Sequence, residues 1–322
     1  MNPFAGSIRC ESFHCRLPNG EEYRSVVRDD VTPAKNEIAG EATLYVMPFD
    51  ISDDSDDRFA MPRKSTPRET HRRGVEEITR RLRAERENGT TPGKTVLSRV
   101  IVRDILSDNP TPIYRKLLDN NPDAFVFYLT TREAGIWLGA SPELLCRKRG
   151  YKIETMALAG TRPSNDGRDW DDKNREEQKI VERFIRDVLS RYCDNVQCSE
   201  PYTRKAGYVE HICSDLTGEL RNEADFGRLL KELSPTPALC GYPRNVAMEE
   251  IKRLEMWPRG LYGGYIALDY GNGEADIYVN LRSMRIECGK AAIYAGGGIM
   301  ADSDPDSEWE ETERKSLFLR TI

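Results

Sequence analysis

The chain has 322 residues, 32% of them charged and 38% hydrophobic, and its formal net charge is −6 at pH 7. This composition is typical of a water-soluble globular protein, and the mild acidic excess argues against nucleic acid as a partner. No apolar run approaches the roughly 18 residues that span a bilayer, and the N-terminal residues lack the apolar core of a secretory signal. We therefore expect a cytoplasmic protein without membrane association, whose eight cysteines are reduced.

The first recognisable secondary structure follows a long polar region. Residues 50–73 are charged and almost without apolar periodicity, which predicts a flexible loop. Residues 74–87 place their apolar side chains on one face of a helix. A β-branched run over 94–105 then predicts a strand.

The remainder of the chain alternates between strand and helix patterns. The clearest helix covers 170–192, where apolar residues repeat with 3.6-residue spacing. The segment 262–296 contains a hairpin turn at Gly271-Asn272-Gly273, and a charged helix is predicted over 306–320. Further strands are predicted at 125–129, 136–139, 144–147 and 153–158, and short helices around Leu229 and Ile251. Clustered strands with hairpin turns and several helices favour an α+β fold with mostly antiparallel sheets.

Residues 89–95, GTTPGKT, superficially match a phosphate-binding P-loop. Only three residues separate the two glycines, where the motif needs four, and Lys94 leads into a strand pattern rather than a helix. Both departures argue against nucleotide binding. Taken without further context, Lys94 is expected to be a solvated lysine at a strand edge.

Ten short segments between about residues 74 and 320 carry a resemblance to a known family. Together they resemble the chorismate-utilising enzymes, which include isochorismate, salicylate, anthranilate and aminodeoxychorismate synthases. The segments are KTVLSR at 94–99, GASPELL at 139–145, LAGTRP at 158–163, REEQKIV at 175–181, VEHICSDLTGEL at 209–220, SPTPALCGYP at 234–243, RGLYGG at 259–264, VNLRS at 279–283, YAGGGI at 294–299 and SEWEETERK at 307–315.

The resemblance implies the fold and its extent. We expect a single chorismate-binding catalytic domain over 1–322, built as a layered α/β/β/α sandwich of two mostly antiparallel sheets, like anthranilate synthase component I. Residues 1–73 match no family segment, which predicts a shortened or divergent N-terminal part in which an outer strand or helix is missing or replaced.

Shorter stretches point to one branch of the family. Position 159 is Ala, where aminodeoxychorismate synthases carry a nucleophilic lysine. The PTPALCG stretch followed by proline is similar to isochorismate synthases, and Lys94 matches their general base. The resemblance therefore implies isomerisation of chorismate to isochorismate, which feeds menaquinone or siderophore biosynthesis.

Two catalytic residues follow from this resemblance, Lys94 as the base that deprotonates water and Glu143 as the acid that protonates the leaving hydroxyl. A base role requires Lys94 to lose its proton near neutral pH, which burial or a nearby cation favours. Glu143 requires the opposite, a pKa raised towards the neutral acid. Without its motif, Glu143 would be read as an exposed carboxylate in the turn after Pro142.

The resemblance also implies Mg²⁺ as the cofactor, held by Glu177, Glu308 and Glu311. Glu308 and Glu311 are three residues apart, so a helix places both on one face. Their neighbours Glu176 and Glu310 remain alternatives, because both segments are rich in acidic residues.

Substrate-binding residues complete the predicted site. Arg282 and Tyr262 match residues that bind the enolpyruvyl carboxylate, and a guanidinium suits that role. The others are Gly160 and Thr161 beside the ring, His211 near the ring carboxylate, and Gly296 and Gly298, whose backbone can approach the substrate. A lone strand histidine is more often structural, so that alternative stays open for His211.

Two other functions remain alternatives. Salicylate synthase shares the Lys94 and Glu143 pair and goes on to eliminate pyruvate, and a chorismate-binding protein without catalysis is a further alternative. Anthranilate synthase is less favoured because it needs ammonia or a glutaminase partner. The only partner we expect is the small molecule chorismate, with no obligate protein partner and a monomer or weak dimer.

Overall fold

The computed structural model describes residues 3–26, 42–50, 52, 55–91 and 93–320. Two eight-stranded sheets form its centre, and every described strand pair is antiparallel. The first sheet runs β12 (Gly241–Tyr242), β4 (Lys94–Asp104), β16 (Lys290–Ile299), β15 (Ser283–Glu287), β6 (Gly135–Ser141), β5 (Phe125–Thr131), β1 (Cys10–Arg16) and β2 (Glu22–Val26). The second runs β10 (Tyr202–Ala206), β11 (Val209–Leu220), β8 (Lys152–Pro163), β7 (Leu144–Arg149), β14 (Glu274–Val279), β13 (Tyr265–Gly271) and β3 (Thr43–Met47), with β9 (Cys193–Cys198) also paired to β11.

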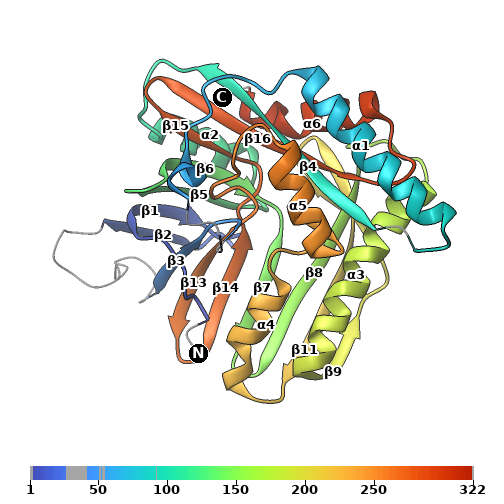
Figure 1. Cartoon of the computed structure of the whole chain (residues 1–322). Helices are drawn as coiled ribbons and strands as arrows, with labels where there is room; N and C mark the ends of the chain where they lie inside the picture. The colour runs from blue at the N-terminus through green and yellow to red at the C-terminus, as the bar shows by residue number, and fades with distance from the viewer. Residues whose placement is uncertain (1–2, 27–41, 51, 53–54, 92, 321–322) are drawn as a thin grey trace.

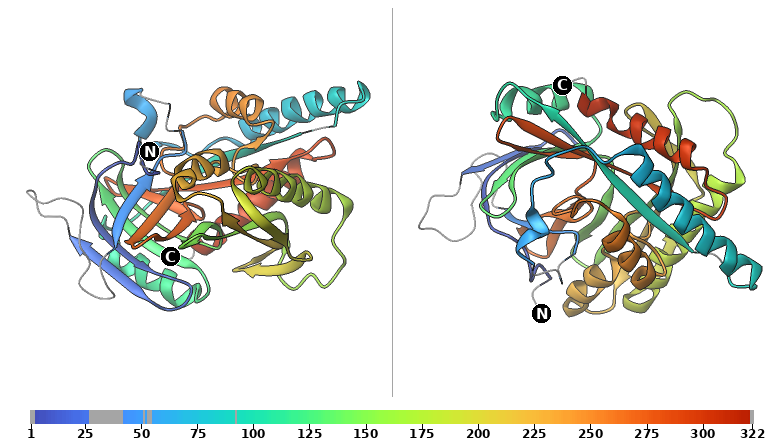
Figure 2. Two further views of the ribbon diagram at one scale, coloured as in Figure 1. Left: turned by 90° about the horizontal axis from the view of Figure 1, so that it is seen from below. Right: turned by 45° about the horizontal axis from the view of Figure 1, so that its top comes forward.

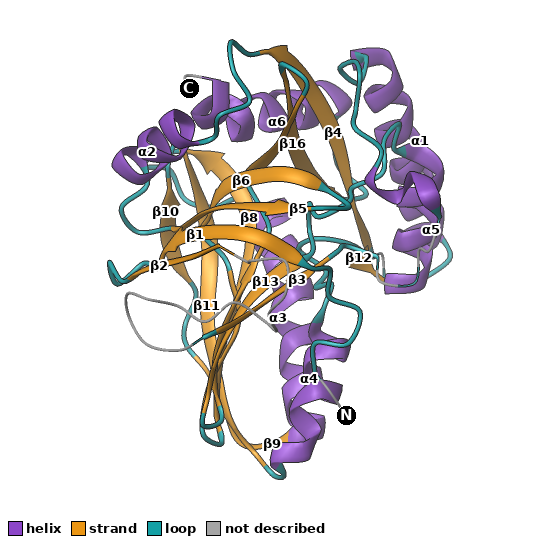
Figure 3. Ribbon diagram, turned by 90° about the vertical axis from the view of Figure 1, so that its left-hand side faces the viewer, coloured by secondary structure: helices purple, strands orange, loops and turns teal. Residues whose placement is uncertain are grey.

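Helices cover the outer face of each sheet (Figure 1). The first sheet carries α1 (Arg68–Glu87), α2 (Thr111–Asn120), α5 (Arg244–Leu254) and α6 (Pro305–Arg320). The second carries α3 (Asp172–Tyr192) and α4 (Phe226–Leu233). Figures 2 and 3 show the helices gathered outside the paired sheets. This arrangement confirms the predicted α/β/β/α sandwich.

Apolar side chains fill the space between the layers. Phe125 on β5 stacks on Tyr278 of β14, with ring centroids 4.3 Å apart, and so joins the two sheets. The α3 helix buries Val181, Ile185 and Leu189 against the second sheet, as its 3.6-residue periodicity predicts.

The N-terminal region contributes to both sheets. β1 and β2 extend the first sheet beyond β5, and β3 pairs with β13 at the edge of the second. The flexible loop predicted over 50–73 is wrong in part, because a 3₁₀ helix η1 covers Asp56–Phe59 and α1 begins at Arg68; residues 51, 53 and 54 lie outside the described residues.

The early start of α1 has a polar cause that apolar periodicity does not detect. Arg73 pairs with Glu69 and Arg72 with Glu76, each four residues apart on the helix. His71 is buried against Trp309 of α6, with ring centroids 5.6 Å apart. These contacts replace the apolar face over the first turns of the helix.

Most of the other predicted elements occur at nearly the predicted bounds. The turn at Asn272 and Gly273 has positive φ at both residues, as its hairpin requires. The elements that were not predicted from the sequence are β1, β2, β3, η1, α2, β9, β10, β12 and a second 3₁₀ helix, η2 (Glu223–Asp225). None of the described helices is long and apolar enough to cross a membrane.

Candidate active site

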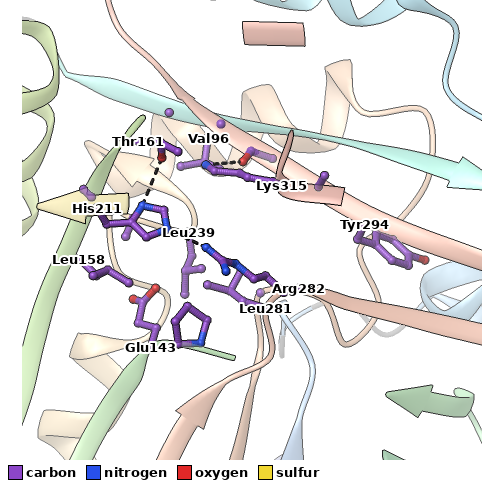
Figure 4. Close-up of a pocket in the computed structure, with 18 of the residues that line it drawn as sticks. Val96, Glu143, Leu158, Thr161, His211, Leu239, Leu281, Arg282, Tyr294 and Lys315 are labelled. Atoms are coloured by element: carbon purple, nitrogen blue, oxygen red, sulfur yellow. Dashed lines mark hydrogen bonds between the residues drawn. The ribbon is translucent and has the colours of Figure 1, made fainter. Parts of the chain in front are cut away.

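A cavity lies where the two sheets approach each other. Its walls come from β4 and β16 of the first sheet, β8 and β11 of the second, the turn before β7, and α6. Figure 4 shows Glu143, His211 and Arg282 around this space. Apolar residues such as Leu158, Leu239 and Leu281 line the rest of it, and a few polar groups in an apolar cavity are typical of a small-molecule site.

A β-bulge in the second sheet forms one wall. The register of β11 on β8 shifts between Glu210 and Ile212, so that Gly160 and Thr161 together oppose His211. Gly160 has a φ of 71°, a conformation that favours glycine. Bulges redirect side chains, and here the bulge places Nδ1 of His211 2.8 Å from the Gly160 carbonyl oxygen.

His211 and Arg282 form a fixed pair in the cavity. Burial and then the charge of Arg282 hold the pKa of His211 well below its usual value, so the ring is neutral. Nδ1 therefore donates to the Gly160 carbonyl, and Nε2, 2.8 Å from Nη2 of Arg282, accepts from it. Arg282 also donates to the Ala206 carbonyl and has a φ of 47°, a strained conformation for a side chain of this size. Burial lowers the pKa of Arg282 to about 10, which leaves the guanidinium charged at neutral pH.

Glu143 is buried in the turn between β6 and β7. Its backbone N–H faces the Ser141 hydroxyl, and its carbonyl accepts from Val279, so the turn is fixed on both sides. Burial raises the pKa of Glu143 to about 8, against the opposing charges of Lys94 and Lys315. The group is therefore mostly protonated at neutral pH, as a general acid must be. The exposed-turn alternative for Glu143 is wrong.

Lys94 lies behind the cavity wall rather than on it. The side chain is completely buried, and Nζ lies 2.9 Å from Oε1 of Glu177 on α3. Burial opposes ionisation of Glu177, but the charge and hydrogen bond of Lys94 outweigh it and hold the pKa of Glu177 below its usual value. Glu177 itself lines the cavity, whereas Lys94 lies behind Gly298, where a Cβ would be 2.1 Å from Oε1 of Glu177 and 3.1 Å from Nζ of Lys94.

Lys94 is therefore not a solvated lysine at a strand edge. β12 pairs with β4 at this point, with Tyr242 opposite Lys94, so β4 is not the edge strand here. A Cβ on Gly93 would lie 1.8 Å from the Tyr242 carbonyl oxygen, so β12 lies directly against Gly93, and Lys94 begins a strand rather than the helix that a P-loop requires.

Residues 296–298 of β16 form a glycine segment in the cavity wall, and two glutamates of α6 lie against its outer side. A Cβ on Gly297 would lie 3.1 Å from Oε2 of Glu308 and 3.2 Å from Oε1 of Glu311. Oε1 of Glu308 accepts from Lys173 and from the Ser303 hydroxyl, whereas its Oε2 is buried without a hydrogen-bond partner among the described residues. Burial and then the charge of Glu311 raise the pKa of Glu308 to about 7.

The carboxylates of Glu177, Glu308 and Glu311 are suitable ligands for a hard cation. Oxygen ligands are what Mg²⁺ prefers, and a cation would neutralise two like charges and use the unpaired oxygen of Glu308. At present each carboxylate is bonded to a lysine, in the pairs Glu177–Lys94, Glu308–Lys173 and Glu311–Lys315. Over the described part of the chain, no three His, Cys, Asp or Glu residues are grouped closely enough to hold a metal ion as they stand. Metal binding would require these carboxylates to move closer together.

The profile of the family described as chorismate binding enzyme matches residues 24–321. The chain belongs to the chorismate binding enzyme family. It is 36% identical over 245 residues to isochorismate synthase 2, chloroplastic, of Arabidopsis thaliana, an alignment that covers 71% of this chain and 43% of that protein. It is 32% identical over 241 residues to anthranilate synthase component 1 of Saccharolobus solfataricus, covering 71% of this chain and 57% of that protein. The chain thus spans about half the length of these curated relatives.

A solved structure shows the same fold. MenF, the menaquinone-specific isochorismate synthase from Escherichia coli, superposes with a TM-score of 0.76 at 21% identity, covering 99% of this chain and 90% of that one. At this identity the likeness concerns the fold. The chorismate binding enzyme fold therefore extends over nearly the whole chain.

The structure brings the residues carried over from the family to one place. The cavity is lined by Gly160, Thr161, His211, Tyr262, Arg282, Gly296 and Gly298, together with Glu143 and Glu177. Lys94, Glu308 and Glu311 lie behind the glycine segment that forms one wall. The two alternatives Glu176 and Glu310 are exposed, whereas Glu177 and Glu308 are buried.

Two cationic residues of the cavity, Lys315 and Arg259, were not predicted from the sequence. Lys315 lines the cavity and donates to the Gly296 carbonyl (3.0 Å) and to Glu311 (2.7 Å). The four-residue spacing of Glu311 and Lys315 on a helix is the signal that could have found it. Arg259 is buried, pairs with Glu255 and donates to the carbonyl of Val96, which fixes another wall.

Proposed function

We propose that this chorismate binding enzyme is an isochorismate synthase that adds water at ring carbon 2 of chorismate and releases the hydroxyl from carbon 4. The observation that supports this most is the burial of Glu143, which raises its pKa. A buried carboxyl with a pKa of about 8 carries a proton at neutral pH and faces the cavity that holds the family's substrate residues.

The proposed proton transfers balance. Lys94 takes a proton from water as the oxygen bonds to carbon 2, the ring double bonds shift, and the bond from carbon 4 to its hydroxyl breaks. Glu143 gives its proton to that hydroxyl, which leaves as water, so one water enters and one leaves. A base role requires an uncharged Lys94, and its hydrogen bond to Glu177 must then be exchanged.

Chorismate carries two carboxylates, and of the three cations that line the cavity, Arg259 is already paired with Glu255, which leaves Arg282 and Lys315 for the substrate. Arg282 is held by His211 and by the Ala206 carbonyl, so its guanidinium is positioned before substrate arrives. Tyr262 is beside it, with a pKa raised to about 12 by burial, so the phenol keeps its proton and can donate it in a hydrogen bond. Lys315 supplies the second charge.

We further propose that Glu177, Glu308 and Glu311 hold Mg²⁺, which would offset the charge of the ring carboxylate. The unpaired oxygen of Glu308 and the proximity of Glu311 support this donor set. A metal that engaged Glu177 would also leave Lys94 without its present partner, which is what the base role requires.

The product distinguishes this proposal from related chemistry. Ala159 lines the cavity in place of a nucleophilic lysine, which argues against the aminodeoxychorismate reaction. Salicylate synthase and anthranilate synthase both release pyruvate from chorismate, and isochorismate synthase does not. Incubation of the purified chain with chorismate, with and without Mg²⁺ and ammonium, followed by chromatography, separates the three. We expect isochorismate without pyruvate; pyruvate with salicylate or anthranilate would reject the proposal. The use of the product for menaquinone or a siderophore stays a prediction.

A further inference from the structure

Arg204 on the edge strand β10 lies beside the cavity and has no ion pair with any residue that the structure describes. β10 and β11 pair in continuous register, and Arg204 is directly opposite His211. Directly opposed residues of an antiparallel pair project to the same face of the sheet. His211 lines the cavity, so Arg204 projects from the cavity face. Arg204 is half-buried, whereas its neighbours Thr203 and Lys205 are exposed.

The charge of Arg204 reaches into the cavity. It opposes the rise in the pKa of Glu143 and lowers the pKa of His211, although Arg204 is not among the residues that line the cavity. Arg204 is therefore near the cavity without lining it, on the side of β10. The β10–β11 hairpin forms this side of the cavity, and the Ala206 carbonyl in it accepts a hydrogen bond from Arg282.

Among the described residues, Arg204 lacks the carboxylate partner that comparable arginines have. Arg162 pairs with Glu210 and Arg259 with Glu255. Across the described residues, no carboxylate lies within ion-pair distance of Arg204, and it makes no side-chain hydrogen bond. A half-buried guanidinium with free donors is suited to a carboxylate from a ligand.

We infer that Arg204 binds a carboxylate of the substrate at the rim of the cavity and thereby increases substrate capture. This inference rests on the proposed function for the dicarboxylate nature of the substrate. Arg259, Arg282 and Lys315 are the cations that line the cavity, with Arg259 paired to Glu255, and Arg204 adds a further one at its edge. Arg204 contributes to substrate binding and takes no part in the proton transfers.

The hairpin offers a matched control. Lys205 carries the same charge on the next residue, but it is opposite Glu210 and its Nζ donates to Asn165 on the other face. Loss of either cation changes the net charge equally. A purely structural or long-range charge effect would therefore affect both variants alike.

The test uses the full chain and chorismate as the probe. Titration calorimetry should show that Arg204→Ala weakens binding about tenfold, that Arg204→Lys recovers part of the loss, and that Lys205→Ala binds normally. KM should rise with little change in kcat, and binding by Arg204→Ala should depend less on salt concentration. Unfolding temperatures check that each variant is folded, and if Arg204→Ala fails to fold, Arg204→Gln replaces it.

Two results would overturn the inference: equal binding by wild type and Arg204→Ala, or equal losses in Arg204→Ala and Lys205→Ala. The proposed function fails separately. If the wild type binds chorismate but forms another product, weaker binding by Arg204→Ala still supports the role of Arg204. If the wild type does not bind chorismate, both proposals are rejected.

Discussion

Nζ of Lys94 lies 2.9 Å from Oε1 of Glu177, and both side chains are almost completely removed from solvent. The pair joins the first residue of β4 to α3 across the glycine segment of β16, so it links the two halves of the sandwich. The same two residues are the proposed base, Lys94, and one proposed metal ligand, Glu177. Under the proposed mechanism, structure and catalysis therefore depend on the same contact.

Removing one member of this pair should cost both stability and activity. Lys94→Met leaves the buried Glu177 carboxylate uncompensated, which should destabilise the fold by about 3–5 kcal/mol. Glu177→Gln in the same chain removes that charge, so the double variant should recover much of the stability while the activity stays lost. Urea unfolding and product chromatography measure the two effects. Recovery of activity in the double variant would contradict the base role of Lys94.

The activity should fall as pH rises through the pKa of Glu143. Because burial raises this pKa to about 8, the acid form is lost above that pH and kcat should decline there. Glu143→Gln should lower kcat roughly 10²–10⁴-fold and abolish this dependence. The exposed Glu133 is the control, since Glu133→Gln should keep the wild-type pH profile. An unchanged basic limb in the residual activity of Glu143→Gln would contradict the assignment.

Glu143 should also make stability depend on pH. A raised pKa means that the folded state binds a proton more tightly than the unfolded chain. The contribution is fully present below the unfolded value near 4.5 and is lost as pH rises through about 8. Unfolding of wild type and Glu143→Gln from acidic to basic pH should show the difference between them change over this interval. A constant difference would argue that Glu143 is not buried as the structure has it.

Magnesium affinity should depend on Glu308 and not on Glu310. Glu308→Gln removes a buried oxygen ligand and should weaken Mg²⁺ binding by about 10- to 100-fold in a calorimetric titration. Glu310→Gln changes an exposed carboxylate on the same helix and should leave the affinity unchanged. Equal affinities for wild type and Glu308→Gln would place the metal elsewhere.

Gly298 should not tolerate a side chain. A Cβ there would lie 2.1 Å from Oε1 of Glu177, so Gly298→Ala should displace Glu177 and lower both Mg²⁺ affinity and turnover. Gly289 lies in the β15–β16 turn, where a Cβ meets nothing closer than 3.8 Å, and the backbone strain of Gly289→Ala should cost only about 1 kcal/mol. Normal Mg²⁺ binding by Gly298→Ala would mean that Glu177 is not a ligand.

The sequence predicted the core of the fold well where apolar periodicity was strong. The α3 helix and the β4, β5 and β13–β14 segments follow directly from that pattern. The start of α1 was missed because ion pairs and a buried histidine hold it. The short strand β12 has only two residues, and its pairing with β4 depends on the preceding turn from Thr236 to Cys240 rather than on a local pattern.

The candidate site also contains residues that the sequence predicted and others that only the structure identifies. Family motifs named the residues around the cavity, but spacing could not separate Glu177 from Glu176 or Glu308 from Glu310, because burial depends on the facing strand. The motif also gave no sign that Lys94 pairs with Glu177, since 83 residues separate them. Arg204 belongs to no family segment and emerges only from the register of β10 on β11.

The most direct test of the central claim is the product formed from chorismate by the purified chain, with and without Mg²⁺. We predict isochorismate as the product, formed only when Mg²⁺ is present and lost in both Lys94→Ala and Glu143→Gln. Formation of salicylate or anthranilate with pyruvate, or binding of chorismate without any turnover, would contradict it.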